Sequence, residues 1–212
     1  MLESASGIIL RTRLLTETSL IVVWLTAEHG RLSTVAKGAR RPKSSYLGKL
    51  DLFYEVNFSF HRSRRSELHT LREVLLCETH ATLRQDLQSL RQASYCTALI
   101  EAATEIDTPI PAIHQLFRET VRVAASSEPR PETLFAFELK LLHELGLGPD
   151  FSECRLTPGA SKLASAFLSE SWDFISHIRA TPSQIGELGQ FLHNYLAYHI
   201  GRIPPGRELA LA

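Results

Sequence analysis

Residues 1–80 alternate between apolar and polar positions with a period of two, in short runs separated by turns. This pattern predicts strands. The clearest run covers residues 51–61, where one face is expected to be buried and the other wet. The other predicted strands cover residues 7–12, 19–26, 31–37 and 67–77. The first part of the chain is therefore expected to form a small five-stranded barrel.

From residue 79 onward the apolar positions follow a helical period. A long helix is expected to run to about residue 106, and the most apolar helix, over residues 132–145, is expected to be central. Further helices are predicted over residues 112–125, 157–169 and 182–201, the last with five inward side chains, Leu188, Phe191, Leu192, Tyr195 and Leu196. The tail over residues 202–212 is expected to be extended.

These patterns predict an α+β multidomain protein. Residues 1–79 are expected to form a five-stranded OB-fold barrel, and residues 80–212 an all-helical domain. OB-folds commonly bind single-stranded nucleic acid through a cationic groove and stacking aromatic rings. Phe53 and Tyr46 are candidates for stacking, and a partly covered surface position is the alternative for Phe53.

Two basic segments lie within the predicted barrel, at residues 29–43 and 61–66. The first contains five cations and no acid around a Gly38-Ala39 pair, which suits contact with a phosphate backbone. A solvated basic turn is the alternative. The predicted nucleic-acid-binding residues are the cations of both segments: Arg31, Lys37, Arg40, Arg41, Lys43, Arg62, Arg64 and Arg65.

The net charge is zero, but the charges are unevenly spread along the chain. Residues 1–80 hold twelve Lys/Arg against eight Asp/Glu, and residues 81–212 hold eleven against fifteen. A polyanion is therefore expected to bind the first, basic domain, and the acidic helical domain is expected to bind partners. No signal peptide, membrane span or CxxC pair is visible, so we expect a cytoplasmic protein with reduced thiols.

Catalytic and cofactor motifs are missing from the sequence. No phosphate-binding loop of the GxxxxGK type, GxSxG elbow or HExxH helix occurs. His193 and His199 are six residues apart and fall on different helical faces, which does not favour a metal site. The sequence predicts a protein that is not an enzyme and holds no cofactor or metal.

Four stretches of the chain resemble the RecO family of bacterial recombination mediators. The most specific is LTAEHGRLSTVAKGARRPKS at residues 25–44, and the supporting ones are GIILRTRLLTETSLIV at 7–22, LLHELGLGPDFSEC at 141–154 and RELAL near the C-terminus. The resemblance touches both predicted domains. It implies an N-terminal OB-fold and a helical C-terminal domain.

The resemblance also implies a non-enzymatic activity. Members bind single- and double-stranded DNA, anneal complementary strands and work with RecR to load RecA onto DNA coated by single-stranded DNA-binding protein, which implies association with the nucleoid. Lys37, Arg40 and Arg41 match the basic motif of the family, whereas the other predicted contacts come from charge alone. Contact with single-stranded DNA-binding protein would need an apolar pocket beside a cation. Arg118 and Arg122 are candidates for that cation, with a solvated helix face as the alternative.

The sequence departs from the family pattern at Cys154. Many members carry a four-cysteine zinc module there, but here no second, third or fourth cysteine follows. Because structural zinc takes four ligands, we predict no zinc and a deleted module.

Two other classes of function remain open from the residues. The barrel could be an adaptor whose basic loop docks an acidic partner peptide, or it could be an RNA-binding module.

Overall fold

The structure, a computed structural model, describes all residues 1–212, which divide into two compact units. The first contains Met1–His80 and, beyond the predicted range 1–79, the segment Thr104–Gln115. The second contains Ala81–Ala103 and Leu116–Ala212. No helix combines the length and apolar character needed to cross a membrane.

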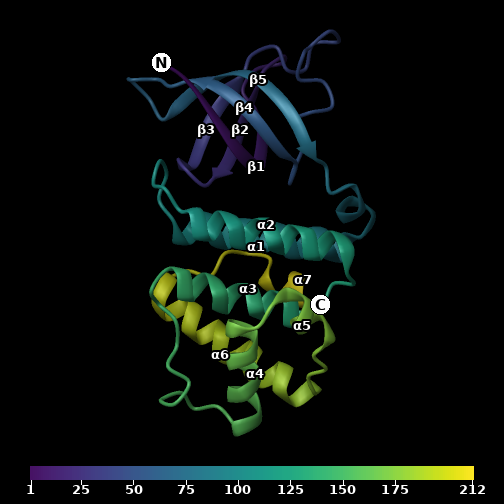
Figure 1. The fold of residues 1–212 in the computed structure, drawn as a ribbon, viewed down its shortest axis with the longest axis vertical. Helices are drawn as coiled ribbons and strands as arrows, with labels where there is room; N and C mark the ends of the chain where they lie inside the picture. Colours follow the sequence, from purple (N-terminus) through teal and green to yellow (C-terminus); the bar gives the residue numbers. More distant parts are fainter. The chain divides into compact units, whose positions relative to one another are not determined.

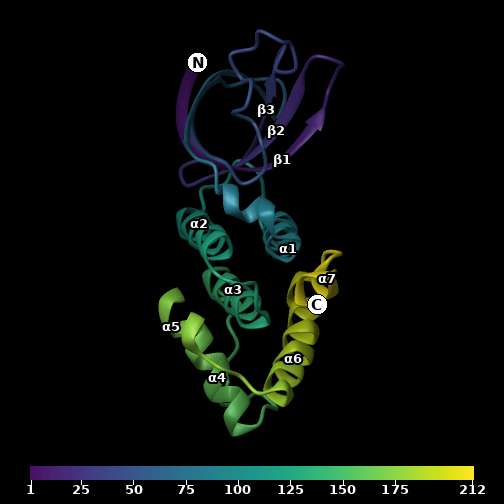
Figure 2. The ribbon, with the colours of Figure 1, turned by 90° about the vertical axis from the view of Figure 1, so that its right-hand side faces the viewer.

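The first unit is a closed five-stranded barrel (Figures 1 and 2). The strand order is β1-β2-β3-β5-β4, and β4 pairs with β1 to close the ring. All pairs are antiparallel except β3 with β5. This is the topology of the predicted OB-fold, and the prediction is confirmed. The strands are β1 (Leu2–Leu14), β2 (Leu20–Thr26), β3 (Gly30–Ala36), β4 (Glu55–His61) and β5 (Leu68–Glu78).

The barrel interior is built from the apolar faces of the alternating strands. Trp24 of β2 stacks on Phe58 of β4 with ring centroids 4.1 Å apart. Its indole Nε1 donates a hydrogen bond to Thr34 Oγ1 on β3 at 2.8 Å, so the buried polar group is satisfied. Phe60 of β4 and Leu71 of β5 belong to the same buried cluster. Over residues 56–60 the period-two pattern therefore marks the buried face.

The strand predicted over residues 51–61 begins only at Glu55. Residues 51–54 form an irregular segment in which Phe53 has a φ of +64° and its N–H donates to Ile9 O at 2.8 Å. Its ring is 1% exposed, so both expectations for Phe53, a stacking aromatic and a partly covered surface aromatic, are wrong. Glu55 falls on the face of this run that was expected to be wet, but it is buried, and its Oε1 lies 3.2 Å from His80 Nε2.

The second unit is helical, and its apolar helix α3 lies at its centre. The side chains of this helix from Leu134 to Leu139 are all buried, and it contacts α4, α5, α6 and α7 of the same unit. The expectation of a central helix is confirmed. The elements are η1 (Ala81–Gln85), α1 (Leu87–Ala103), α2 (Pro111–Ser126), α3 (Pro131–Glu144), α4 (Pro158–Ser169), α5 (Trp172–His177), α6 (Pro182–Ile200) and α7 (Arg207–Leu211).

Two helical predictions were wrong in detail. The long helix expected to reach about residue 106 is divided at Asp86, whose carboxylate accepts a hydrogen bond from Ser89 N–H at 2.6 Å and so caps α1. The tail expected to be extended instead forms α7, because Arg207 is buried and bonded to Glu138. The short α5 had no predicted counterpart.

Candidate nucleic-acid interface

The loop that follows β3 is fixed at its start to the turn between β1 and β2. Arg40 N–H donates to Thr18 O at 3.0 Å, and Gly38 N–H donates to Ser19 Oγ at 3.2 Å. Gly38 has a φ of +68°, a conformation that favours glycine. Ala39 is buried in the barrel core. The backbone at residues 38–40 is therefore held in one place while its neighbouring side chains point to solvent.

Four predicted DNA-binding cations lie on this loop, and all four are exposed. The side chains of Lys37, Arg41 and Lys43 form no ion pair or hydrogen bond within the chain. Arg40 donates to Glu17 O at 2.9 Å, which ties it to the β1–β2 turn. We refer to Lys37, Arg40, Arg41 and Lys43 as the loop cations. Unpaired cations on an ordered backbone are suited to contact with phosphates.

The strand register places the loop cations and the 62–67 turn at opposite ends of the barrel. β5 runs parallel to β3, with Ser33 facing Leu68, so the 62–67 turn lies beside the start of β3. The loop cations follow the end of β3. Six residue steps along a strand span about 20 Å, so Arg31 and Lys37 are separated by roughly the length of the barrel wall.

Arg31 and Arg62 both have partners within the first unit. Arg31 Nε donates to Thr104 Oγ1 at 2.9 Å, and its guanidinium also donates to Thr104 O. Arg62 pairs with Glu3 at 2.9 Å and with Asp107 Oδ1 at 3.0 Å. These two arginines hold the 104–108 segment against the barrel, so each has a structural role besides its predicted DNA contact.

The remaining cations of this end, Arg64 and Arg65, are exposed and make no side-chain bond within the chain. Their assignment as DNA contacts stays a prediction.

Tyr46, the second aromatic candidate for stacking, is half-buried. Its hydroxyl donates to Leu71 O and Arg72 O at 3.1 and 3.0 Å, which holds the ring against β5. Burial raises the pKa of its phenol, with Arg72 and Glu73 as smaller influences. Every aromatic ring among residues 1–80 is in fact buried or half-buried.

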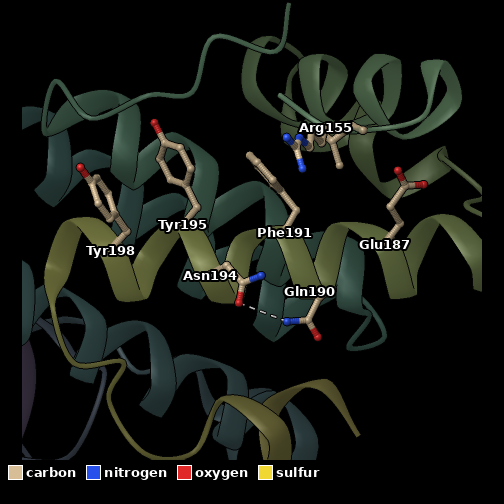
Figure 3. Close-up of a pocket in the computed structure, with 8 residues that line it drawn as sticks. Arg155, Glu187, Gln190, Phe191, Asn194, Tyr195 and Tyr198 are labelled. Carbon is tan, nitrogen blue, oxygen red and sulfur yellow. Dashed lines mark hydrogen bonds between the residues drawn. The ribbon is translucent and has the colours of Figure 1, made fainter. Parts of the chain in front are cut away.

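A cavity of about 520 Å³ lies on the outer side of α6 in the second unit (Figure 3). Phe191, Tyr195 and Tyr198 project from this side of the helix, and Arg155 lies across from Phe191. The rings of Phe191 and Tyr195 are 5.4 Å apart. The lining residues are Arg155, Leu156, Glu187, Gln190, Phe191, Asn194, Tyr195 and Tyr198.

The sequence analysis missed this cavity because it assigned Phe191 and Tyr195 to the inward face of the last helix. The structure buries Leu188, Leu192 and Leu196 but leaves both aromatic rings partly exposed. The four-residue spacing of Phe191 and Tyr195 places both rings on one side of a helix, and this spacing could have indicated an aromatic surface there. Arg118 and Arg122, the predicted candidates beside a partner pocket, lie on α2 and do not line this cavity.

The residues around Cys154 do not suit the four-cysteine zinc module that, by the family resemblance, many members carry at this place. Cys154 Sγ donates to Asp150 O at 3.1 Å, while Cys96 is buried in α1 and Cys77 belongs to the barrel. No three His, Cys, Asp or Glu side chains converge as metal ligands do.

Comparison with known proteins identifies the family. The family models "Recombination protein O N terminal" and "Recombination protein O C terminal" match residues 1–80 and 84–157. A protein of Alkaliphilus metalliredigens named DNA repair protein RecO is 31% identical over 201 residues, covering 92% of this chain and 81% of the relative.

Proteins of the same name match from Symbiobacterium thermophilum, at 34% identity, and from Bacillus subtilis, at 30%. These two alignments cover 72% and 73% of this chain, which spans 60% of the length of each relative. Together with the two matching family models, they lead to one conclusion: the chain belongs to the RecO family.

Proposed function

We propose that this chain is a DNA-binding recombination mediator that binds and anneals single-stranded DNA in recombinational repair, without catalysing a covalent step. The observation that carries the proposal is the set of loop cations. Three of them lack any side-chain partner within the chain, and the loop is fixed to the β1–β2 turn by hydrogen bonds from the backbone of Gly38 and Arg40. Family membership and the closed OB-fold barrel support the same function.

The mechanism follows from electrostatics. Two DNA strands repel each other through their phosphates, and cations that contact phosphates release condensed counterions and reduce that repulsion. The loop cations contact the backbone rather than the base edges, so the bases stay free to pair with a complement. Annealing by this route requires position and charge but no catalytic residue.

The proposed partners are those that the family implies: RecR, single-stranded DNA-binding protein and, indirectly, RecA, at the nucleoid in the cytoplasm. For the acidic end of single-stranded DNA-binding protein we propose the cavity on α6. It combines aromatic rings, from Phe191 and Tyr195, with the exposed guanidinium of Arg155. An apolar surface beside a cation suits a peptide that carries both an apolar side chain and a carboxylate.

The proposed DNA site can be tested by measuring the rate at which the protein anneals two complementary oligonucleotides. The variant Lys37→Ala/Arg41→Ala/Lys43→Ala removes the three unpaired loop cations. The matched variant Arg72→Ala/Lys162→Ala/Arg202→Ala removes three exposed cations that are not among the predicted DNA contacts and have no side-chain partner within the chain, so both variants lose the same charge.

We expect the loop variant to lose most of the annealing rate and the matched variant to keep most of it. Equal losses would show that only net charge matters and would contradict a site on the loop. Stronger competition by RNA than by DNA of the same sequence would favour the RNA-binding alternative, because only contacts to the 2′-hydroxyl separate the two. Loss of DNA binding with retained peptide binding would favour the adaptor.

A further inference from the structure

The turn between β1 and β2 exposes two leucines beside the loop cations. Leu14, the last residue of β1, is 64% exposed, and Leu15 is 45% exposed. Exposed leucines are ordinary when they occur singly, but two neighbours at the end of a hairpin form an apolar tip. We refer to Leu14 and Leu15 as the leucine tip.

The leucine tip is held in a fixed position by its own turn. Leu15 N–H donates to Ser19 O at 3.0 Å, and Thr16 Oγ1 accepts from Ser19 N–H at 3.1 Å. The same turn accepts two hydrogen bonds from Arg40, one from its N–H to Thr18 O and one from its guanidinium to Glu17 O. The tip and the loop cations therefore form one ordered end of the barrel.

A DNA strand bound at this end of the barrel would bring its bases close to the leucine tip, which is apolar but not aromatic. Phe53 is 1% exposed, and Tyr46 is half-buried with its hydroxyl bonded to β5, so neither is a fully exposed ring. Leucine is among the side chains that proteins place against or between unstacked bases. The charges of the neighbouring loop suit the phosphates of the same strand, which identifies the occupant of the apolar surface as nucleic acid.

We propose that Leu14 and Leu15 contact unstacked bases of a single DNA strand whose phosphates lie against the loop cations. This inference rests on the proposed function and names the second half of the same site. The leucines supply an apolar, sequence-independent contact that does not depend on salt, and the loop cations supply the contact that does. The two halves can therefore be separated by experiment.

The experiment compares Leu14→Ala/Leu15→Ala with Leu2→Ala across a salt series, using fluorescence anisotropy of a labelled single-stranded oligonucleotide. Leu2 is a suitable control because it is 57% exposed at the opposite end of the same strand. We expect the double variant to bind about fivefold to tenfold more weakly at every salt concentration, with an unchanged slope of log K against log[salt]. Leu2→Ala should bind like the wild type.

A second readout reports on the bases themselves. An oligonucleotide containing 2-aminopurine should change its fluorescence on binding to the wild type, and this change should shrink in the double alanine variant. Leu14→Met/Leu15→Met keeps an apolar tip and should restore both affinity and fluorescence. If the alanine variant binds as tightly as the wild type with an unchanged fluorescence response, the inference is wrong. A wild type that fails to bind DNA would instead overturn the proposed function.

Discussion

Arg207 donates two hydrogen bonds to the carboxylate of Glu138, from Nε at 2.7 Å and from the second terminal nitrogen at 2.9 Å. Glu138 is fully buried in the central helix α3, and Arg207 begins the C-terminal helix α7. Tyr95 OH donates to the same carboxylate at 2.7 Å. Burial, and then the neighbouring Glu138, raise the pKa of Tyr95 far above its ordinary value, so the phenol stays a donor.

We expect Arg207→Ala to lower the free energy of unfolding by about 3–5 kcal/mol, because it leaves the Glu138 charge buried without its partner. The double variant Glu138→Leu/Arg207→Leu should recover much of that loss, since no unpaired charge remains. Urea unfolding followed by circular dichroism measures both. Arg202→Ala, at an exposed position nearby in sequence, is the control, and an Arg207→Ala variant as stable as this control would contradict the account.

Stability of the first unit is expected to fall in mild acid because of His69. This side chain is 2% exposed and stacks on Phe60 at 5.4 Å, and burial lowers its pKa below 6.5 although Asp107 opposes the shift. A lowered pKa in the folded state means that the unfolded chain takes up the proton more readily. The contribution is therefore complete above about pH 6.5 and is lost as pH falls through the folded-state pKa.

The measurement is the free energy of unfolding at pH 7.5 and pH 5.5 for the wild type and His69→Phe. The variant keeps a ring against Phe60 but cannot titrate, so its difference between the two pH values should be smaller than that of the wild type. Equal differences would show that His69 does not contribute to the acid sensitivity.

Two glycines with the same backbone conformation should differ sharply in their tolerance of alanine. Gly30 has a φ of +63°, and a Cβ there would lie 1.8 Å from Thr108 O. Gly48 has a φ of +72° and nothing within 4 Å. Gly48→Ala should cost only the backbone strain, about 1–2 kcal/mol, whereas Gly30→Ala must also displace the 104–108 segment and should cost clearly more. Thermal unfolding compares them, and equal costs would argue against this packing.

Arg62 and Arg64 belong to one predicted basic turn but should respond differently to substitution. Arg62 pairs with Glu3 and Asp107, so Arg62→Ala is expected to cost about 1–2 kcal/mol of stability. Arg64 is exposed without a partner in the chain, and Arg64→Ala should stay within about 0.5 kcal/mol of the wild type. Urea unfolding of both variants measures this, and a neutral Arg62→Ala would show that the 104–108 segment does not depend on this residue.

The period-two and helical patterns predicted the barrel and the central helix because burial of one face imposes those periods. The errors arose where distant partners decide the conformation. Phe53 leaves the strand because its N–H bonds to Ile9 O. Arg207 begins a helix because it bonds to Glu138, and no local pattern reveals this partner because it lies far away in sequence.

The candidate site was predictable only in part. The basic loop is visible in the sequence as a run of cations without acids. Its separation from the 62–67 turn is not, because that depends on the parallel pairing of β3 with β5. Likewise, the partners of Arg31 and Arg62 lie in the 104–108 segment or in β1, and no local pattern connects them.

The most direct test of the central claim is the salt dependence of single-stranded DNA binding for the wild type and Lys37→Ala/Arg41→Ala/Lys43→Ala. Each phosphate contact contributes about 0.7 to the slope of log K against log[salt] for a single strand. If all three loop cations contact phosphates, the variant should bind more weakly with a slope shallower by about two. A folded variant with the wild-type slope would show that the loop does not contact the DNA backbone.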